Sequence, residues 1–415
     1  MALLRQLASF SHRWRATGVV PLSALGTPLV PPPPSLGGGV SPSPSSLFGR
    51  SPLVRPAAAA LSTALLLPPV AFVGLGAMGL PMANRLAAAG VRLRVYDESP
   101  AAVGAFFDSL PPLSAAAGGR VTAVEKLEEL FPLSSERPHA PAGVGGSGGD
   151  PLTTPPPIAL ITMLPSTAAV AATLHALAPR APVGAVLIDM STIPPAESRA
   201  LAARVAAVMG GGDDGGGSGG RVHVLDAPVS GGTAAAAAGT LTIIVGGASD
   251  SVAAVTPLLS IMGRPVHVGA CGAGQVVKAA NNLVLGASMA AVAEATALAA
   301  AAGVPPVTTA GVLATSSGRC WAGDVYHPAP GVVAGAPAGR GYTGGFRVEL
   351  MRKDLGIAQG MGTARGGKTP TPMADAAAAV YRQMSEGGGQ GKDFSGVFQY
   401  VYRGTKGDNR SGAGA

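Results

Sequence analysis

The chain contains few of the residues that build metal sites and disulfide frameworks. Its 415 residues include two cysteines, Cys271 and Cys320, and six scattered histidines. The cysteines are far apart, form no C-x-x-C pair and have no histidine cluster beside them, so neither a zinc site nor a disulfide framework is supported. We therefore expect no bound metal and two free thiols.

The motifs of hydrolytic enzymes are also missing. The chain has no G-x-S-x-G elbow between a predicted strand and a predicted helix, no H-E-x-x-H and no paired-carboxylate arrangement. One phosphate-binding motif, G-x-x-x-x-G-K-T, is present as GTARGGKT at 362–369, but the preceding VELMRKDLGIAQGM predicts a helix where a P-loop needs a strand. Pro370 and Pro372 follow it, which disfavours the helix that should come next. We expect no nucleoside triphosphate site there.

Acidic residues are absent from the start of the chain, and the first one is Asp97. Residues 1–69 carry five arginines, several serines and an early run of apolar residues spaced for one helical face, which is typical of an organelle transit peptide. We predict that 1–69 is a transit peptide, with a disordered segment as the alternative, and these residues leave both the mitochondrion and the plastid open as the destination. Without these arginines the formal net charge falls from +7 to +2, so charge gives no reason to expect a nucleic-acid partner.

Length and the placement of glycine and proline predict two folded domains. The 61 glycines and 38 prolines concentrate in the first seventy positions and in inserts such as 141–149 and 210–220, while the segments between them are apolar. The stretch 276–303 is long enough to span a membrane, but it contains Lys278 and Glu294. We interpret it as a buried core helix and expect no membrane partner.

Residues 70–97 predict one β-α-β unit with a dinucleotide-binding turn. Gly74, Gly76 and Gly79 form G-x-G-x-x-G between a strand and a helix, where the bare backbone lets a pyrophosphate reach unpaired N–H groups. Asp97 ends the second strand and is placed to bond the ribose hydroxyls of NAD. An NADP enzyme would more often have an arginine there, so the sequence favours NAD.

Further strands alternate with helical stretches and predict a doubly wound parallel sheet of the α/β class. The predicted strands lie within 158–166, 186–192, 222–232, 241–247 and 265–269. Ligands of such sheets bind beyond the carboxyl ends of the strands, where Leu164, Pro165, Thr192 and Ser230 fall.

Lys278 stands in the apolar opening of the long predicted helix. Asn282 follows four residues later, so both side chains share one helical face at the junction with the dinucleotide-binding domain. A partly desolvated ammonium has its pKa lowered toward working pH, which suits proton exchange with a substrate hydroxyl.

Several of these segments together resemble the β-hydroxyacid dehydrogenase family. The matching stretches occur in the family's order and spacing over roughly 70–402. They are FVGLGAMGLPMANRL, DAPVSGGTAAAAAGTL, GAGQVVKAANN and FRVELMRKDLGIA. Three others, SGRCWAGDVYHPAPGV, GYTGGF and KDFSGVFQYV, resemble the branch that oxidises 3-hydroxyisobutyrate.

The resemblance implies a role for each matching residue. Lys278 would be the catalytic acid and base. Substrate would be bound by Ser230, Gly231, Gly232 and Asn282, and NAD by Gly74, Leu75, Gly76, Ala77, Met78, Gly79, Asp97, Leu164, Pro165, Thr192 and Lys353.

The resemblance also implies a domain order and a reaction. An NAD-binding Rossmann domain over 70–269 would precede an all-helical domain over 270–405 and a disordered tail, 406–415, in a homodimer or homotetramer. The expected reaction is NAD-dependent oxidation of 3-hydroxyisobutyrate to methylmalonate semialdehyde in valine degradation, which the resemblance implies for the mitochondrial matrix. The alternatives are a glyoxylate or succinic semialdehyde reductase of the same fold and a non-catalytic cofactor-binding module.

Overall fold

The computed structural model describes residues 69–110, 121–132, 158–209, 222–363 and 369–405. All of them belong to one compact unit, Arg55–Ala415. The transit peptide predicted for 1–69, apart from its last residue, lies outside the described residues. So do the glycine-rich inserts and the tail 406–415.

Six parallel strands form the larger part of a central sheet. Their order in space is β3-β2-β1-β4-β5-β6, the order of a doubly wound dinucleotide-binding fold. They are β1 (Val70–Val73), β2 (Leu93–Tyr96), β3 (Val121–Ala123), β4 (Ala159–Thr162), β5 (Val186–Asp189) and β6 (His223–Asp226). The predicted Rossmann class is confirmed.

The other end of the sheet departs from the predicted parallel arrangement. β8 (Leu241–Gly246) pairs antiparallel with β6 and with β7 (Val229–Ser230), and β9 (Gly263–Gly269) pairs parallel with β8. The connection between β7 and β8 holds only the seven-residue helix α8 (Gly232–Ala238). A parallel crossover needs a dozen or more residues, so the chain turns back at Gly239, whose φ is 70°, and returns antiparallel.

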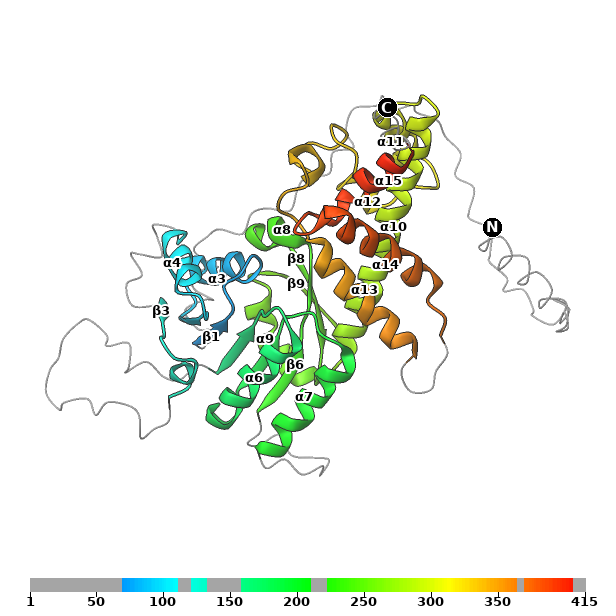
Figure 1. Cartoon of the computed structure of the whole chain (residues 1–415). Helices are drawn as coiled ribbons and strands as arrows, with labels where there is room; N and C mark the ends of the chain where they lie inside the picture. Colours follow the sequence, from blue (N-terminus) through cyan, green and yellow to red (C-terminus); the bar gives the residue numbers. More distant parts are fainter. Residues whose placement is uncertain (1–68, 111–120, 133–157, 210–221, 364–368, 406–415) are drawn as a thin grey trace, which may run out of the picture. The chain divides into compact units, whose positions relative to one another are not determined.

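Both faces of the sheet are buried, which explains why its strands are short apolar runs. Successive side chains alternate between two cores: Phe72 and Ile188 belong to one, Ala71 and Leu187 to the other. Helices cover each face (Figure 1). On the first face they are α3 (Gly79–Ala88), α4 (Pro100–Asp108), α8 and α9 (Ser249–Leu259); on the second, η1 (Leu127–Leu130), α6 (Thr167–Leu177), η3 (Ala178–Arg180) and α7 (Pro195–Val208).

The rest of the described chain is helical, as predicted. The helices are α10 (Ala273–Ala301), α11 (Pro306–Thr315), α12 (Trp321–Asp324), η4 (Pro337–Arg340), α13 (Val348–Thr363), α14 (Pro372–Met384), the π-helical turn η6 (Ser385–Gly389), η7 (Phe394–Gly396) and α15 (Val397–Thr405). A third core, which includes Met289, Leu355, Tyr381 and Phe394, holds α10, α12, α13, α14, η7 and α15 together. α13 occupies the segment before the P-loop-like letters, so that segment is a helix, as expected.

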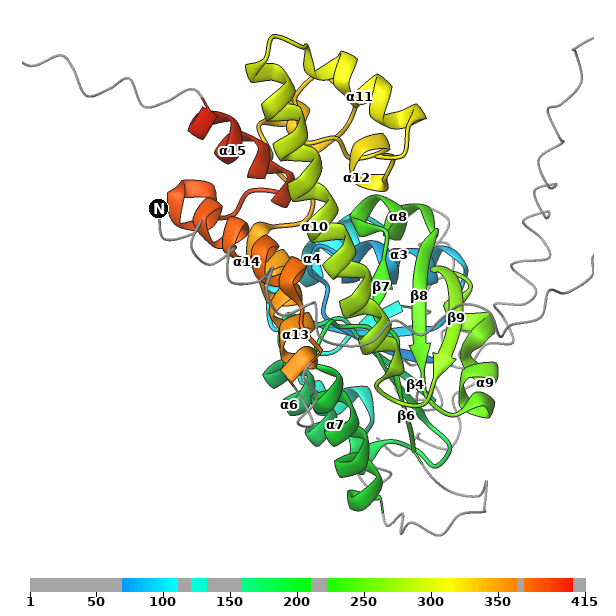
Figure 2. The same cartoon turned by 90° about the vertical axis from the view of Figure 1, so that its right-hand side faces the viewer.

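Helix α10 joins the sheet to the other helices. By length and composition it could span a membrane, but it packs against β8 and β9 at one end and against α13, α14 and α15 beyond (Figure 2). Its first turn lies so close to the sheet that a Cβ at Gly274 would stand 2.5 Å from the Ile244 carbonyl oxygen. Only glycine permits this approach, which places the residues after Gly274 beside the carboxyl ends of the strands.

Candidate active site

The glycine loop between β1 and α3 has the geometry of a phosphate cradle. Gly74 has φ of 98°, and a Cβ there would stand 2.3 Å from the Met163 carbonyl oxygen. A Cβ at Gly79 would overlap the carbonyl oxygen of Gly74. Both glycines are therefore required for the tight turn. Gly76 and Ala77 are exposed at its tip, beside the amino end of α3, where backbone N–H groups can receive an anion.

Asp97 lies directly beside this loop. One carboxylate oxygen accepts a hydrogen bond from the Leu75 backbone nitrogen at 2.7 Å, and the other accepts from the Ser99 nitrogen at 2.8 Å. The structure thus brings the glycine loop and Asp97 together, although Leu75 and Asp97 are 22 residues apart in the sequence. The residues present fit a nicotinamide dinucleotide, because a bare backbone turn, a helix amino end and an acceptor for ribose hydroxyls meet at one edge of the sheet.

The loops after β4 and β5 lie at the same edge and are tied to one another. The Leu164 nitrogen donates to the Ser191 hydroxyl at 2.9 Å, while Pro165 is exposed and Thr192 is half-buried. Asp189 positions Ser191, because its carboxylate accepts a hydrogen bond from the Ser191 backbone N–H at 3.1 Å. These two loops carry the residues predicted to line the nicotinamide.

Gln275 fastens the first turn of α10 to the loop after β5. Its side-chain oxygen accepts from the Ile193 nitrogen at 3.2 Å, and its side-chain nitrogen donates to the Ser191 carbonyl at 2.8 Å. The same turn is capped by Asp226, which accepts from the Gly272 nitrogen at 2.6 Å and the Gln275 nitrogen at 2.9 Å. The helix that carries Lys278 is therefore held in register with the edge of the sheet.

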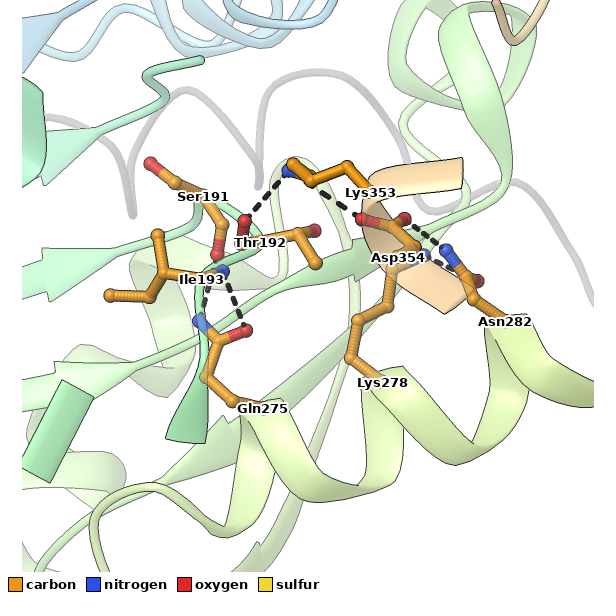
Figure 3. Close-up of polar contacts among 8 residues, drawn as sticks. All are labelled: Ser191, Thr192, Ile193, Gln275, Lys278, Asn282, Lys353 and Asp354. Carbon is orange, nitrogen blue, oxygen red and sulfur yellow. Dashed lines mark hydrogen bonds and ion pairs between the residues drawn. The ribbon is translucent and has the colours of Figure 1, made fainter. Parts of the chain in front are cut away.

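Lys278 points into a polar cluster between α10 and α13 (Figure 3). The Lys278 side-chain nitrogen donates to the Asn282 side-chain oxygen at 3.0 Å, and the Asn282 amide nitrogen donates to a carboxylate oxygen of Asp354. Lys353 lies 3.5 Å from the other Asp354 oxygen and donates to the Thr192 carbonyl at 2.8 Å. The cluster thus reaches from α10 through α13 to the loop after β5.

Burial makes Lys278 a weaker base than a lysine in water. Its relative exposure is 8%, and desolvation lowers its pKa from 10.5 to about 8. The carboxylate of Asp354 opposes this shift, and the positive charge of Lys353 adds to it. An amine with a pKa near 8 can both lose and regain a proton close to physiological pH, which a general acid and base must do.

The loop predicted to bind the substrate connects β7 to α8. Ser230 ends β7, and Gly231 and Gly232 follow with φ of 136° and 72° at the start of α8. Both glycines are exposed, so their backbone N–H groups can be approached. β7 pairs with β8, against which α10 packs. Within the described residues no hydrogen bond is recorded between this loop and Lys278 or Asn282.

Sequence reasoning did not find five of the residues that organise this site. Asp354 lies within the stretch FRVELMRKDLGIA and Gln275 within GAGQVVKAANN, but neither stretch assigns these two residues a role. Ser191, Asp189 and Asp226 had the faint signal of a polar residue directly after an apolar strand. That signal marks the correct edge of the sheet, but it does not reveal which polar groups meet.

Comparison with known proteins matches both halves of the chain. Residues 69–132 and 158–272 match the family model of the NAD binding domain of 6-phosphogluconate dehydrogenase, and residues 272–401 match NAD-binding of NADP-dependent 3-hydroxyisobutyrate dehydrogenase. The fold and the site define a nicotinamide-dependent hydroxyacid dehydrogenase. The prediction of NAD as the cofactor is confirmed by the match to an NAD binding domain together with an NAD-dependent relative.

Individual relatives identify the family. The chain is 37% identical over 334 residues to human mitochondrial 3-hydroxyisobutyrate dehydrogenase, an alignment that covers 80% of this chain and 86% of the human one. It is 38% identical to the NAD-dependent L-serine dehydrogenase of Pseudomonas aeruginosa, covering 81% of this chain and 99% of the relative. A solved structure of Mycobacterium tuberculosis 3-hydroxyisobutyrate dehydrogenase with L-serine is 30% identical with a TM-score of 0.65, covering 81% of this chain and 99% of that chain. This chain belongs to the 3-hydroxyisobutyrate dehydrogenase family.

Proposed function

We propose that the protein oxidises 3-hydroxyisobutyrate to methylmalonate semialdehyde with NAD, as a step of valine degradation in the mitochondrial matrix. The observation that carries the proposal is the buried Lys278 amine, bonded to Asn282 beside the edge of the sheet that bears the glycine loop. Human, mouse and other relatives with this name are mitochondrial, and the acid-free start of the chain agrees with such a destination.

In this proposal each residue has one task. The neutral Lys278 amine takes the proton of the substrate C3 hydroxyl, and the resulting ammonium releases that proton to water; in the reverse direction the ammonium donates its proton to the carbonyl oxygen. Asn282 holds the lysine and the substrate in register. The hydroxyl of Ser230 and the backbone N–H groups of Gly231 and Gly232 bind the substrate carboxylate. NAD, when bound, would supply the acceptor for the hydride of the substrate C3.

The cofactor contacts are proposed on the same basis. The turn Gly74–Gly79 would cradle the pyrophosphate, and Asp97 would accept from the ribose hydroxyls and repel the 2′-phosphate of NADP. Leu164, Pro165 and Thr192 would line the nicotinamide side. Lys353 would reach the cofactor from α13, because it already extends to the Thr192 carbonyl.

L-serine is the second candidate substrate. One relative acts on L-serine and one related structure contains it. L-serine and 3-hydroxyisobutyrate share a carboxylate and a C3 hydroxyl and differ at C2, so the same lysine chemistry serves both. The glyoxylate or succinic semialdehyde reductase has less support, since those reactions usually use NADPH and Asp97 disfavours it. The presence of Lys278 and Asn282 argues against a non-catalytic module.

We also propose a homodimer or homotetramer that uses the free side of α10. That side carries small residues and exposed apolar ones, among them Val284 at 65% and Leu298 at 71% exposure. Light scattering coupled to size-exclusion chromatography tests this proposal. A monomer at micromolar concentration would contradict it.

The test of function is an initial-rate panel with 3-hydroxyisobutyrate, L-serine, glyoxylate and succinic semialdehyde, each with NAD(H) and NADP(H). We expect the highest kcat/KM for 3-hydroxyisobutyrate with NAD. Lys278→Met should lose most of the turnover and still bind NADH, measured by its fluorescence. Faster turnover of glyoxylate with NADPH would overturn the substrate assignment, and an active Lys278→Met variant would overturn the mechanism.

A further inference from the structure

Asp354 is a buried carboxylate for which the proposed mechanism has no task. Its exposure is 2%, and it lies on α13 between the two lysines of the site. Its contacts are the Asn282 amide nitrogen and the Lys353 ammonium. A charge that is costly to bury and is bonded to a residue beside the reacting groups calls for an explanation.

The first consequence of Asp354 is a fixed orientation of the Asn282 amide. An ionised carboxylate only accepts hydrogen bonds, so it must face the NH₂ end of the amide. The oxygen end then faces Lys278 and accepts from its amine at 3.0 Å, while the Asn281 amide also donates to that oxygen at 3.0 Å. If the amide were reversed, its NH₂ group would face the Lys278 ammonium. The hydrogen bonds from Lys278 and from Asn281 to the amide oxygen would then be lost.

The second consequence is electrostatic. Among the described residues the charged groups that act on the Lys278 amine are Asp354, which raises its pKa, and Lys353, which lowers it. Both belong to α13. Burial alone favours the neutral amine, so without a nearby negative charge the ammonium would be still harder to form.

We propose that Asp354 is a positioning residue that fixes the amide of Asn282 and supplies the counter-charge that lets buried Lys278 carry a proton. This role rests on the proposed function, because it matters only if Lys278 exchanges a proton with substrate. Asp354 acts through Asn282 and through its charge and does not touch the substrate.

The test is the pH profile of kcat/KM in both reaction directions for the wild type and Asp354→Asn. The variant keeps an oxygen that can accept from Asn282 and loses the charge. We expect the limb assigned to Lys278 to move from about pH 8 to lower pH by about one unit. At pH 7, kcat/KM for oxidation should then be about one half of its high-pH plateau in the variant, compared with about one tenth in the wild type. At pH 8, kcat/KM for semialdehyde reduction should fall. A merely structural defect would lower both directions.

Two further variants test the direction of the shift in the pH profile and provide a control in which no shift is expected. Lys353→Met removes a positive charge, so its limb should move to higher pH, opposite to Asp354→Asn. Asp375→Asn removes an exposed carboxylate of α14 that accepts from Gln359, and its profile should match the wild type. Far-ultraviolet circular dichroism and thermal unfolding confirm that each variant is folded.

Competitive acetylation of Lys278, quantified by mass spectrometry across pH, measures its protonation without turnover. A lower Lys278 pKa in Asp354→Asn supports the inference, and coincident titration curves in wild type and variant overturn it. The proposed function fails separately, if the wild type lacks a limb near pH 8 or if Lys278→Met remains active. The two failures are therefore distinguishable.

Discussion

The buried carboxylate of Asp189 should make the protein less stable as pH rises through the acid range. Asp189 lies at the end of β5 and is 4% exposed. One of its oxygens accepts from the Thr162 hydroxyl at 2.9 Å and from the Ser191 nitrogen at 3.1 Å, while the other has no hydrogen-bond partner among the described residues. The perturbation we choose is Asp189→Asn, which keeps an acceptor for both donors and cannot ionise.

The magnitude follows from the shift of its pKa. Burial raises the pKa of Asp189 from 3.8 to about 6, the charge of Asp226 adds to the shift, and the bonds from Ser191 and Thr162 oppose it. The folded state holds this proton more tightly than the unfolded state, so the stability it supplies is complete below pH 3.8 and lost by the time pH has passed about 6. About two pKa units correspond to roughly 3 kcal/mol. The unpartnered NH₂ group of the variant costs about 1–3 kcal/mol at every pH.

The assay is urea unfolding of both proteins, followed by circular dichroism at intervals from pH 4 to pH 7. The free energy of unfolding of Asp189→Asn minus that of the wild type should rise by roughly 2 kcal/mol across this range, whatever its value at pH 4. The slope carries the prediction, because the cost of the unpartnered group does not depend on pH. A flat difference curve would show that Asp189 titrates alike in the folded and unfolded chain, and the reasoning would be refuted.

Two further predictions concern the cofactor edge of the sheet. Asp97→Asn removes the charge that would repel a 2′-phosphate, so the preference for NAD over NADP in kcat/KM should fall by about tenfold or more, roughly 1.4 kcal/mol; an unchanged ratio beside an Asp108→Asn surface control would contradict the role given to Asp97. Gln275→Leu leaves the Ile193 N–H and the Ser191 carbonyl without their partner, each loss costing about 1–3 kcal/mol. Thermal unfolding should shift down and the KM for NAD should rise, and a variant with wild-type Tm and KM would show that this link does not hold the loop.

Local patterns in the sequence predicted the elements of the fold and several residues of the site. The turn Gly74–Gly79 between a strand and a helix depends on backbone geometry that neighbouring residues dictate. Lys278 and Asn282 share a face because they are four apart on one helix. The antiparallel return of β8 was missed because the run Leu241–Gly246 reads alike in either direction, and only the length of the preceding connection decides.

The sequence by itself determined the β-α-β unit, the cofactor turn and the placement of Lys278 with Asn282, since each arises from contacts within a few residues or from one repeated strand pattern. Only the tertiary structure decided that Asp354 bonds to Asn282, which is 72 residues away in the sequence. It likewise decided that Gln275 fastens the loop after β5 through Ser191, which is 84 residues away. It also decided the protonation behaviour of Lys278. A pKa depends on burial and on nearby charges, and both are set by packing of segments distant in the sequence.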